Sequence, residues 1–114
     1  MRQGEIYMVD LEPTKGREQQ GRRPVFIVSP DALNKIFAPI VCPITGGGVS
    51  ARDAGFTVSL HGPGLRTDGA ILCHQIRTLD VKARGGKRVE RAPDAVIEDV
   101  LNAIRDIFEA SLSG

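Results

Sequence analysis

The hydrophobic pattern of this chain changes its period once, close to Pro93, and this change limits the possible folds more than any other feature. Before Pro93, apolar residues occur in short runs separated by glycine and proline, which is typical of strands and turns. After it, apolar residues recur every three or four positions, which predicts one amphipathic helix. The apolar positions of this helix are Val96, Ile97, Val100, Leu101, Ile104, Ile107, Phe108 and Leu112.

The region before Pro93 is predicted to contain several short strands. We expect a short helix over residues 31–37, and a hairpin in which Gly85 and Gly86 join residues 79–84 to 88–91. Short strands at close spacing favour a small barrel or a sandwich, with the C-terminal helix packed on it. A chain of 114 residues has room for one such domain, so residues 1–114 are predicted to form a single α+β domain. The strand-like runs cover residues 6–11, 25–29, 40–45, 56–61 and 70–76.

The composition argues against several classes of protein. With 41% hydrophobic and 25% charged residues the chain is typical of a globular protein, and no apolar run is long enough to cross a membrane. The N-terminus lacks the pattern of a secretory signal, so we expect a cytoplasmic location. Cys42 and Cys73 lie in apolar runs and are expected to be buried thiols. Because no Cys/His spacing fits a zinc site and residues 46–48 lack a P-loop lysine, no metal or cofactor is expected.

The net charge of +1 conceals an uneven distribution. Residues 94–109 hold five acids against one base, while bases gather in residues 15–23 and 77–91. Such basic clusters attract phosphates or acidic peptides, although a merely solvated face remains the alternative.

The polar loop over residues 12–24 joins two predicted strands and holds Arg17, Glu18, Arg22 and Arg23. A carboxylate beside guanidinium groups can act as a general base while a guanidinium binds phosphate. An exposed, salt-bridged loop is the other interpretation. RNA can be cleaved through its own 2′-hydroxyl by a base, an acid and a cation, without a metal.

Five segments of the chain carry a resemblance to known proteins: GEIYMVDLEPTKGREQQGRRP (4–24), VSP (28–30), PIT (43–45), RDAGF (52–56) and residues 69–88. Together they resemble the MazF/PemK family of toxins, and the PemK branch in particular. The resemblance implies a homodimer of SH3-like antiparallel β-barrels with appended helices, the CcdB/PemK-like fold. It also implies an endoribonuclease that cuts single-stranded RNA at short sequences and leaves a 2′,3′-cyclic phosphate and a 5′-hydroxyl. A cognate antitoxin with an acidic, partly disordered C-terminal segment would silence it, and DNA would be reached only through the antitoxin complex.

The resemblance also implies roles for individual residues. Arg23, Thr45 and Glu18 match catalytic positions of the family. The residues at or near RNA-groove positions are Arg17, Gln19, Asp68, Gln75, Arg77 and Arg84.

Three positions depart from the PemK pattern. Leu72 and His74 replace an arginine and an aspartate that are the branch's proposed acid/base partners. His74 could take over proton transfer, because the pKa of histidine is near 6.5, or it could only help to bind RNA; both remain open. Asp68 stands where PemK-type grooves have threonine, and its charge would repel phosphate unless it reads a base amino group.

Two other functions remain as alternatives. The loss of the arginine at Leu72 is compatible with a catalytically weak module that only binds nucleic acid or antitoxin. A gyrase poison like CcdB is less well supported. Similarity to CcdB would imply an exposed tryptophan near the C-terminus, and this chain has no tryptophan. The five aromatic residues are mostly expected in the core, so base recognition would rest on guanidinium planes and hydrogen bonds rather than on stacking.

Overall fold

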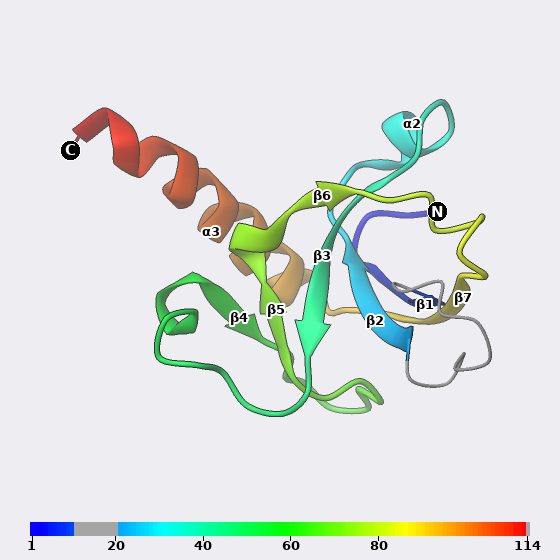
Figure 1. The fold of residues 1–114 in the computed structure, drawn as a ribbon, viewed down its shortest axis with the longest axis horizontal. Coiled ribbons are helices and arrows are strands. Elements are labelled where there is room, and N and C mark those ends of the chain that lie inside the picture. Colours follow the sequence, from blue (N-terminus) through cyan, green and yellow to red (C-terminus); the bar gives the residue numbers. More distant parts are fainter. Residues whose placement is uncertain (11–20, 114) are drawn as a thin grey trace.

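The computed structural model describes residues 1–10 and 21–113, and within these ranges seven short strands form one curled antiparallel sheet (Figure 1). The strand order is β4-β5-β3-β2-β1-β7, and β6 pairs with β3 beside this path. The sheet is barrel-like without closing, because among the described residues β4 and β7 end the path. The strands are β1 (Glu5–Asp10), β2 (Arg22–Ile27), β3 (Ile40–Thr45), β4 (Thr57–Ser59), β5 (Ala70–Leu72), β6 (Arg77–Thr78) and β7 (Lys87–Arg91).

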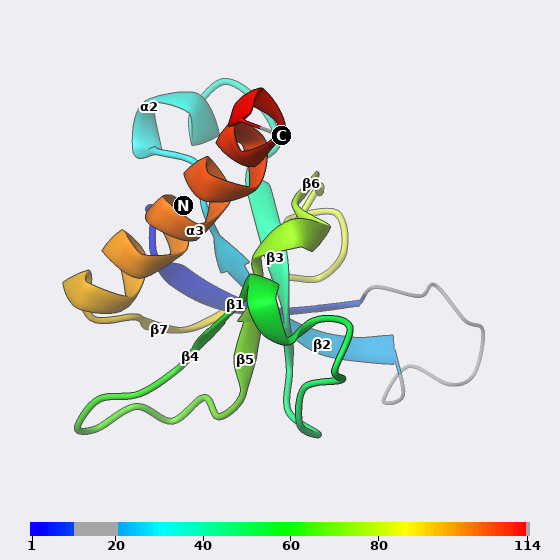
Figure 2. The ribbon, with the colours of Figure 1, turned by 90° about the vertical axis from the view of Figure 1, so that its left-hand side faces the viewer.

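The long helix α3 (Asp94–Ser113) lies across one face of the sheet (Figure 2). The carbonyl of Pro93 accepts hydrogen bonds from the backbone N–H groups of Val96 and Ile97, so proline stands just before the first helical turn, where its missing N–H matters least. This confirms the predicted mainly β fold with an amphipathic C-terminal helix. Phe108, however, was predicted to pack in the core and is 63% exposed, because the C-terminal half of α3 extends beyond the strands (Figure 1).

Strands β1 to β3 bury both of their faces, since alternate side chains point to opposite sides of the sheet. Ile6, Phe26 and Cys42 point toward α3 and join the larger core cluster. Their neighbours Val25 and Val41 point to the other side. There they pack in a second cluster that is completed by Val9, Ile27, Leu79 and Val81.

The second cluster explains why the predicted hairpin is wrong. Residues 81–85 form turns instead of a strand, and β7 pairs with β1. Gly85 has a φ of +63°, and a Cβ on Gly86 would lie 2.4 Å from the Val81 side chain. The two glycines therefore allow residues 81–86 to fold back against Val81, whose side chain is fully buried in the second cluster.

Two other predicted segments are shorter than expected. The run over residues 70–76 ends as a strand at Leu72 and continues as the 3₁₀ turn η2 (Cys73–Gln75). The expected helix over residues 31–37 is the single turn α2 (Asp31–Asn34). A second 3₁₀ turn, η1 (Ala54–Phe56), precedes β4.

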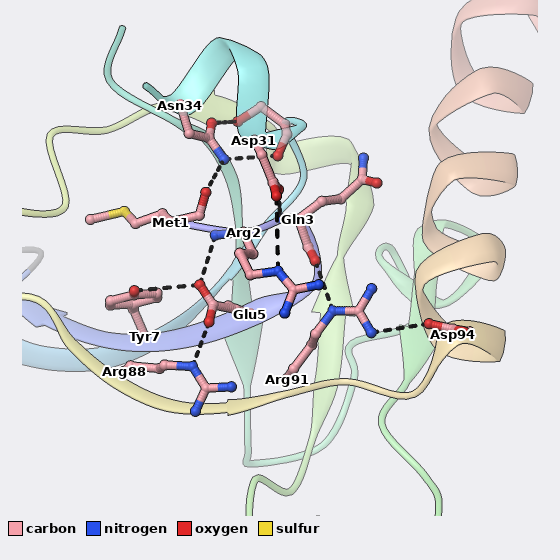
Figure 3. A network of polar contacts seen from close by, with 11 residues as sticks. Met1, Arg2, Gln3, Glu5, Tyr7, Asp31, Asn34, Arg88, Arg91 and Asp94 are labelled. Atoms are coloured by element: carbon pink, nitrogen blue, oxygen red, sulfur yellow. Dashed lines mark hydrogen bonds and ion pairs between the residues drawn. The ribbon is translucent and has the colours of Figure 1, made fainter. Parts of the chain in front are cut away.

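The buried carboxylate of Glu5 anchors the N-terminal segment to β7 (Figure 3). It accepts hydrogen bonds from the backbone N–H of Arg2 at 2.7 Å and from the Tyr7 hydroxyl at 3.4 Å, and it pairs with Arg88 at 2.5 Å. Burial opposes the charge of Glu5, but the Arg2 N–H and the Arg88 guanidinium outweigh it and hold the pKa of this carboxyl below its usual value.

The two cysteines are free and buried, as predicted. Burial raises the pKa of Cys42 to about 12 and that of Cys73 to about 11, so neither forms a reactive thiolate at neutral pH. Among the described residues, no helix combines the length and apolarity that a membrane span requires.

Candidate functional site

A hollow of about 470 Å³ lies where the ends of β2 and β3 meet the loop before β5. It brings together three of the residues singled out in the sequence: Arg23, Thr45 and Asp68. The exposed guanidinium of Arg23 donates one hydrogen bond, at 3.1 Å, to the neighbouring carbonyl of Arg22. The rest of this cation faces solvent and is available to an anion.

The pairing of β2 with β3 places Arg23 beside Thr45. Val25 pairs with Pro43, so Arg23 and Thr45 lie two residues further along the two strands, on the same side of the sheet. Thr45 in turn pairs with Ala70 of β5. A Cβ on Gly69 would lie 2.2 Å from the Thr45 carbonyl oxygen, so only glycine allows the loop that carries Asp68 to approach so closely.

Two further hollows continue from the first along the same side of the sheet. The second, of about 330 Å³, shares Pro43 with the first and is lined by Gln75 and Arg77. The third, of about 410 Å³, shares Gln75 with the second and is lined by His74 and Asp53. Neighbouring hollows share a lining residue, and we call the three hollows together the groove.

His74 lies in the third hollow with both ring nitrogens unavailable. Nε2 is 2.9 Å from Oδ1 of Asp53, and Nδ1 is buried without a hydrogen-bond partner among the described residues. The ring also packs against Phe56, with the ring centres 5.3 Å apart. The Ser50 hydroxyl donates to Asp53 at 2.9 Å. That bond, together with His74 and against the effect of desolvation, keeps the pKa of Asp53 below its ordinary value.

The other predicted residues have different positions. Leu72 is buried, so this position presents no charged group to the groove. Arg84 donates from Nη1 to the carbonyl of Asp10 at 3.1 Å and lies at the end of β1, outside the three hollows. Arg17, Glu18 and Gln19 lie outside the residues that the structure describes. Between residues 21 and 110, no three His, Cys, Asp or Glu side chains gather in a group that could hold a metal ion.

Sequence reasoning missed Asp53, which lines the third hollow, and Phe56, whose ring packs against His74. Both belong to the RDAGF segment, which carried the resemblance but received no role. The expectation that most aromatic residues are in the core is wrong: Phe37, Phe56 and Phe108 are all exposed. Alternation placed Phe56 at the start of a strand, whereas it ends the η1 turn, and this turn leaves its ring 43% exposed beside His74.

Fold and groove together define a small, barrel-like antiparallel β-domain with an exposed cation in its first hollow, and comparison with known proteins assigns such a domain to a family. Residues 2–108 match the family described as "PemK-like, MazF-like toxin of type II toxin-antitoxin system", and the chain belongs to this family.

Two curated relatives and one solved structure illustrate the similarity. The chain is 54% identical over 109 residues to endoribonuclease PemK of Escherichia coli, covering 95% of this chain and 82% of the relative. It is 40% identical over 107 residues to the endoribonuclease toxin ChpB of Escherichia coli (strain K12), covering 93% and 92%. The crystal structure of MazF from Deinococcus radiodurans superposes with a TM-score of 0.77 at 28% identity, covering 95% and 96% of the two chains.

Proposed function

We propose that this protein is the toxin of a type II toxin–antitoxin pair and acts as an endoribonuclease on single-stranded RNA. The observation that carries the proposal is the first hollow, where a solvent-facing guanidinium, Arg23, lies beside the hydroxyl side chain of Thr45. This arrangement suits a phosphodiester, because the guanidinium can bind two of its oxygens while the hydroxyl orients it. Family membership supports the same function, since the relatives are named endoribonucleases.

The reaction needs three events at one phosphate. A base removes the proton of the ribose 2′-hydroxyl, and the 2′-oxygen attacks phosphorus. The bond from phosphorus to the 5′-oxygen of the next nucleotide breaks, that oxygen takes up a proton from water, and the base returns its proton to the solvent. We assign the base to Glu18 and the stabilisation of the charge that develops on the phosphate to Arg23. The products are a 2′,3′-cyclic phosphate and a 5′-hydroxyl.

His74 is better placed to support the site than to move a proton. Its Nε2 is engaged by Asp53, and its Nδ1 is buried without a hydrogen-bond partner among the described residues. We therefore assign His74 to holding Asp53 and the η1 turn beside the RNA, with Gln75 and Arg77 binding the strand in the second hollow. Arg17 and Gln19 are expected to extend this surface, and Arg84 to contribute from the end of β1.

The proposed partners rest on the family resemblance and on the cations of the groove. We propose a homodimer that binds single-stranded RNA and a cognate antitoxin, whose acidic, partly disordered segment competes for the groove. DNA would be reached only through the antitoxin complex, and the cytoplasm is the expected place of action.

A cleavage assay on a long synthetic RNA in the presence of EDTA tests the proposal. We expect cuts at a short recurrent sequence, with cyclic phosphate and 5′-hydroxyl ends. Cleavage that requires added magnesium, or products with 5′-phosphates, would contradict the mechanism. If a folded, antitoxin-free protein cleaved no RNA, the proposed enzyme activity would be wrong, and the alternative of a module that only binds nucleic acid or antitoxin would be favoured.

A further inference from the structure

The first hollow contains a carboxylate that the proposed chemistry does not use. Asp68 is exposed, lines the hollow with Arg23 and Thr45, and has no hydrogen bond or ion pair to any described residue. Such a carboxylate beside a phosphate site is unfavourable unless the ligand brings it hydrogen-bond donors, because an ionised carboxylate only accepts. The hollow therefore presents a cation on one side and an unpaired acceptor on the other.

The loop that carries Asp68 is held firmly in place. At its base, Leu60 donates its backbone N–H to the Gly69 carbonyl at 2.9 Å. Nearer its tip, the Glu90 carboxylate of β7 accepts the backbone N–H of Thr67 and the Thr67 hydroxyl, both at 2.6 Å. It also accepts the N–H of Arg66 at 3.0 Å.

The state of Glu90 agrees with this role. Desolvation opposes its charge, but the Thr67 hydroxyl and the two backbone donors prevail and lower the pKa of the carboxyl below its ordinary value. Glu90 is thus ionised at neutral pH and fixes the residue that precedes Asp68. A side chain held by an anchored backbone can discriminate between ligands, since it cannot easily move away from a poor one.

We infer that Asp68 is a specificity-determining residue that accepts a hydrogen bond from the exocyclic amino group of a base next to the phosphate bound by Arg23, with Glu90 as its positioning residue. The inference rests on the proposed function. Cytosine, adenine and guanine carry such an amino group and uracil does not. Guanine in addition places a ring N–H beside its amino group, which would engage both carboxylate oxygens. Single-stranded RNA exposes these base edges to the protein.

The test compares substrates that differ by one amino group. Cleavage mapping with the wild type identifies the base at the preferred position. A short RNA with that base is then compared with the same RNA carrying the analogue without the amino group: inosine for guanosine, purine riboside for adenosine, or zebularine for cytidine. We expect kcat/KM to fall by about 5- to 100-fold with the analogue, the range of one good base contact.

Variants assign this discrimination to the proposed residues. Asp68→Asn keeps the shape of the side chain but adds a donor, so we expect the ratio between the two substrates to fall below about 3-fold. Glu90→Gln removes the charge that holds Thr67, and we expect an intermediate ratio with little loss of cleavage on the analogue. Asp99→Asn and Glu98→Gln are matched controls on exposed positions of α3, and they should keep the wild-type ratio.

Each outcome supports or overturns a specific statement. Equal cleavage of both RNAs by the wild type, or unchanged discrimination in Asp68→Asn, overturns the role of Asp68 while leaving the ribonuclease intact. Wild-type discrimination in Glu90→Gln overturns the positioning role alone. A wild type that cleaves no RNA overturns the proposed function, and with it this inference.

Discussion

His74 shows how a single residue can have the right chemistry and the wrong exposure for catalysis. Imidazole is the side chain that most often transfers protons near neutral pH. The structure instead pairs Nε2 with Asp53 and buries Nδ1, so a proton transfer to RNA would first require Nε2 to leave Asp53. The sequence alone left both roles open, and the contacts favour the supporting one.

The two roles predict different kinetics for variants. We expect His74→Ala to raise KM and to lower the single-turnover rate on saturating RNA by less than about 10-fold, because it loosens the η1 turn without removing a reacting group. His74→Gln keeps an N–H donor for Asp53 and should recover most of the lost affinity. Glu18→Gln should lower the rate by roughly 10²- to 10⁴-fold, the usual contribution of one positioned proton-transfer group.

The opposite ranking would assign proton transfer to His74. A loss above about 10²-fold in His74→Ala, together with the disappearance of one limb of the pH–rate profile near neutrality, would contradict the supporting role.

At the scale of the element, β7 connects parts of the chain that are distant in sequence. It pairs with β1, so that Glu5 lies opposite Arg91, and it presents Glu90 to the loop before β5. Periodicity predicted a strand here but gave it residues 79–84 as a partner. A pattern of apolar residues predicts that a strand forms and which face it buries. It does not identify the partner strand, because any neighbouring strand can form hydrogen bonds with its backbone N–H and C=O groups.

The two carboxylates joined through β7 predict how stability depends on pH. The folded state lowers the pKa of both Glu5 and Glu90 below the ordinary 4.5, so it binds fewer protons than the unfolded state in this range. Their stabilisation is therefore complete above about pH 4.5 and is lost as the pH falls through the folded pKa values. Urea unfolding between pH 7 and pH 3 should show this decline.

Glu5→Gln tests the assignment. The variant loses a charge-assisted hydrogen bond, so the free energy of unfolding at pH 7 should fall by about 1 to 3 kcal/mol, and its decline toward acid should be shallower. Glu98→Gln, on the exposed side of α3, should keep the wild-type slope. A wild-type slope in Glu5→Gln would mean that other groups control acid unfolding.

At the scale of the whole molecule, charge is separated between the groove and the helix. Residues 94–109 are acidic, whereas the three hollows of the groove hold Arg23, Arg52 and Arg77 against the two carboxylates of Asp53 and Asp68. An acidic peptide and an RNA strand would both be drawn to the same side of the protein and repelled by α3.

Competition between the two ligands tests this arrangement. An acidic antitoxin segment should displace an RNA that carries a 2′-deoxy sugar at the cleavage site, and both affinities should fall as salt is raised. Arg77→Ala should weaken both ligands, because it removes a cation from the second hollow. Simultaneous binding without mutual weakening would show that the antitoxin uses another surface.

The features that could be predicted from the sequence depend on residues close together in the chain, and those that could not depend on residues far apart in it. The bounds of β3 and the start of α3 follow from local patterns, and these predictions were accurate to within one residue. The contact of His74 with Asp53 and that of Glu90 with Thr67 each join residues more than 20 positions apart. Such contacts depend on the conformation of loops, and the periodicity of apolar residues does not predict loop conformation. The meeting of Arg23 with Thr45 was expected only from the family resemblance.

The central claim is that the hollow around Arg23 is where the phosphate reacts, and Arg23→Ala tests it most directly. The side chain is exposed and bonds only to a neighbouring carbonyl among the described residues, so the variant should fold with an unchanged melting temperature. Its single-turnover rate on saturating RNA should fall by roughly 10²-fold or more, the scale of one lost electrostatic donor, while the affinity for uncleavable RNA changes far less. A folded Arg23→Ala protein that cleaves at nearly the wild-type rate would contradict the account.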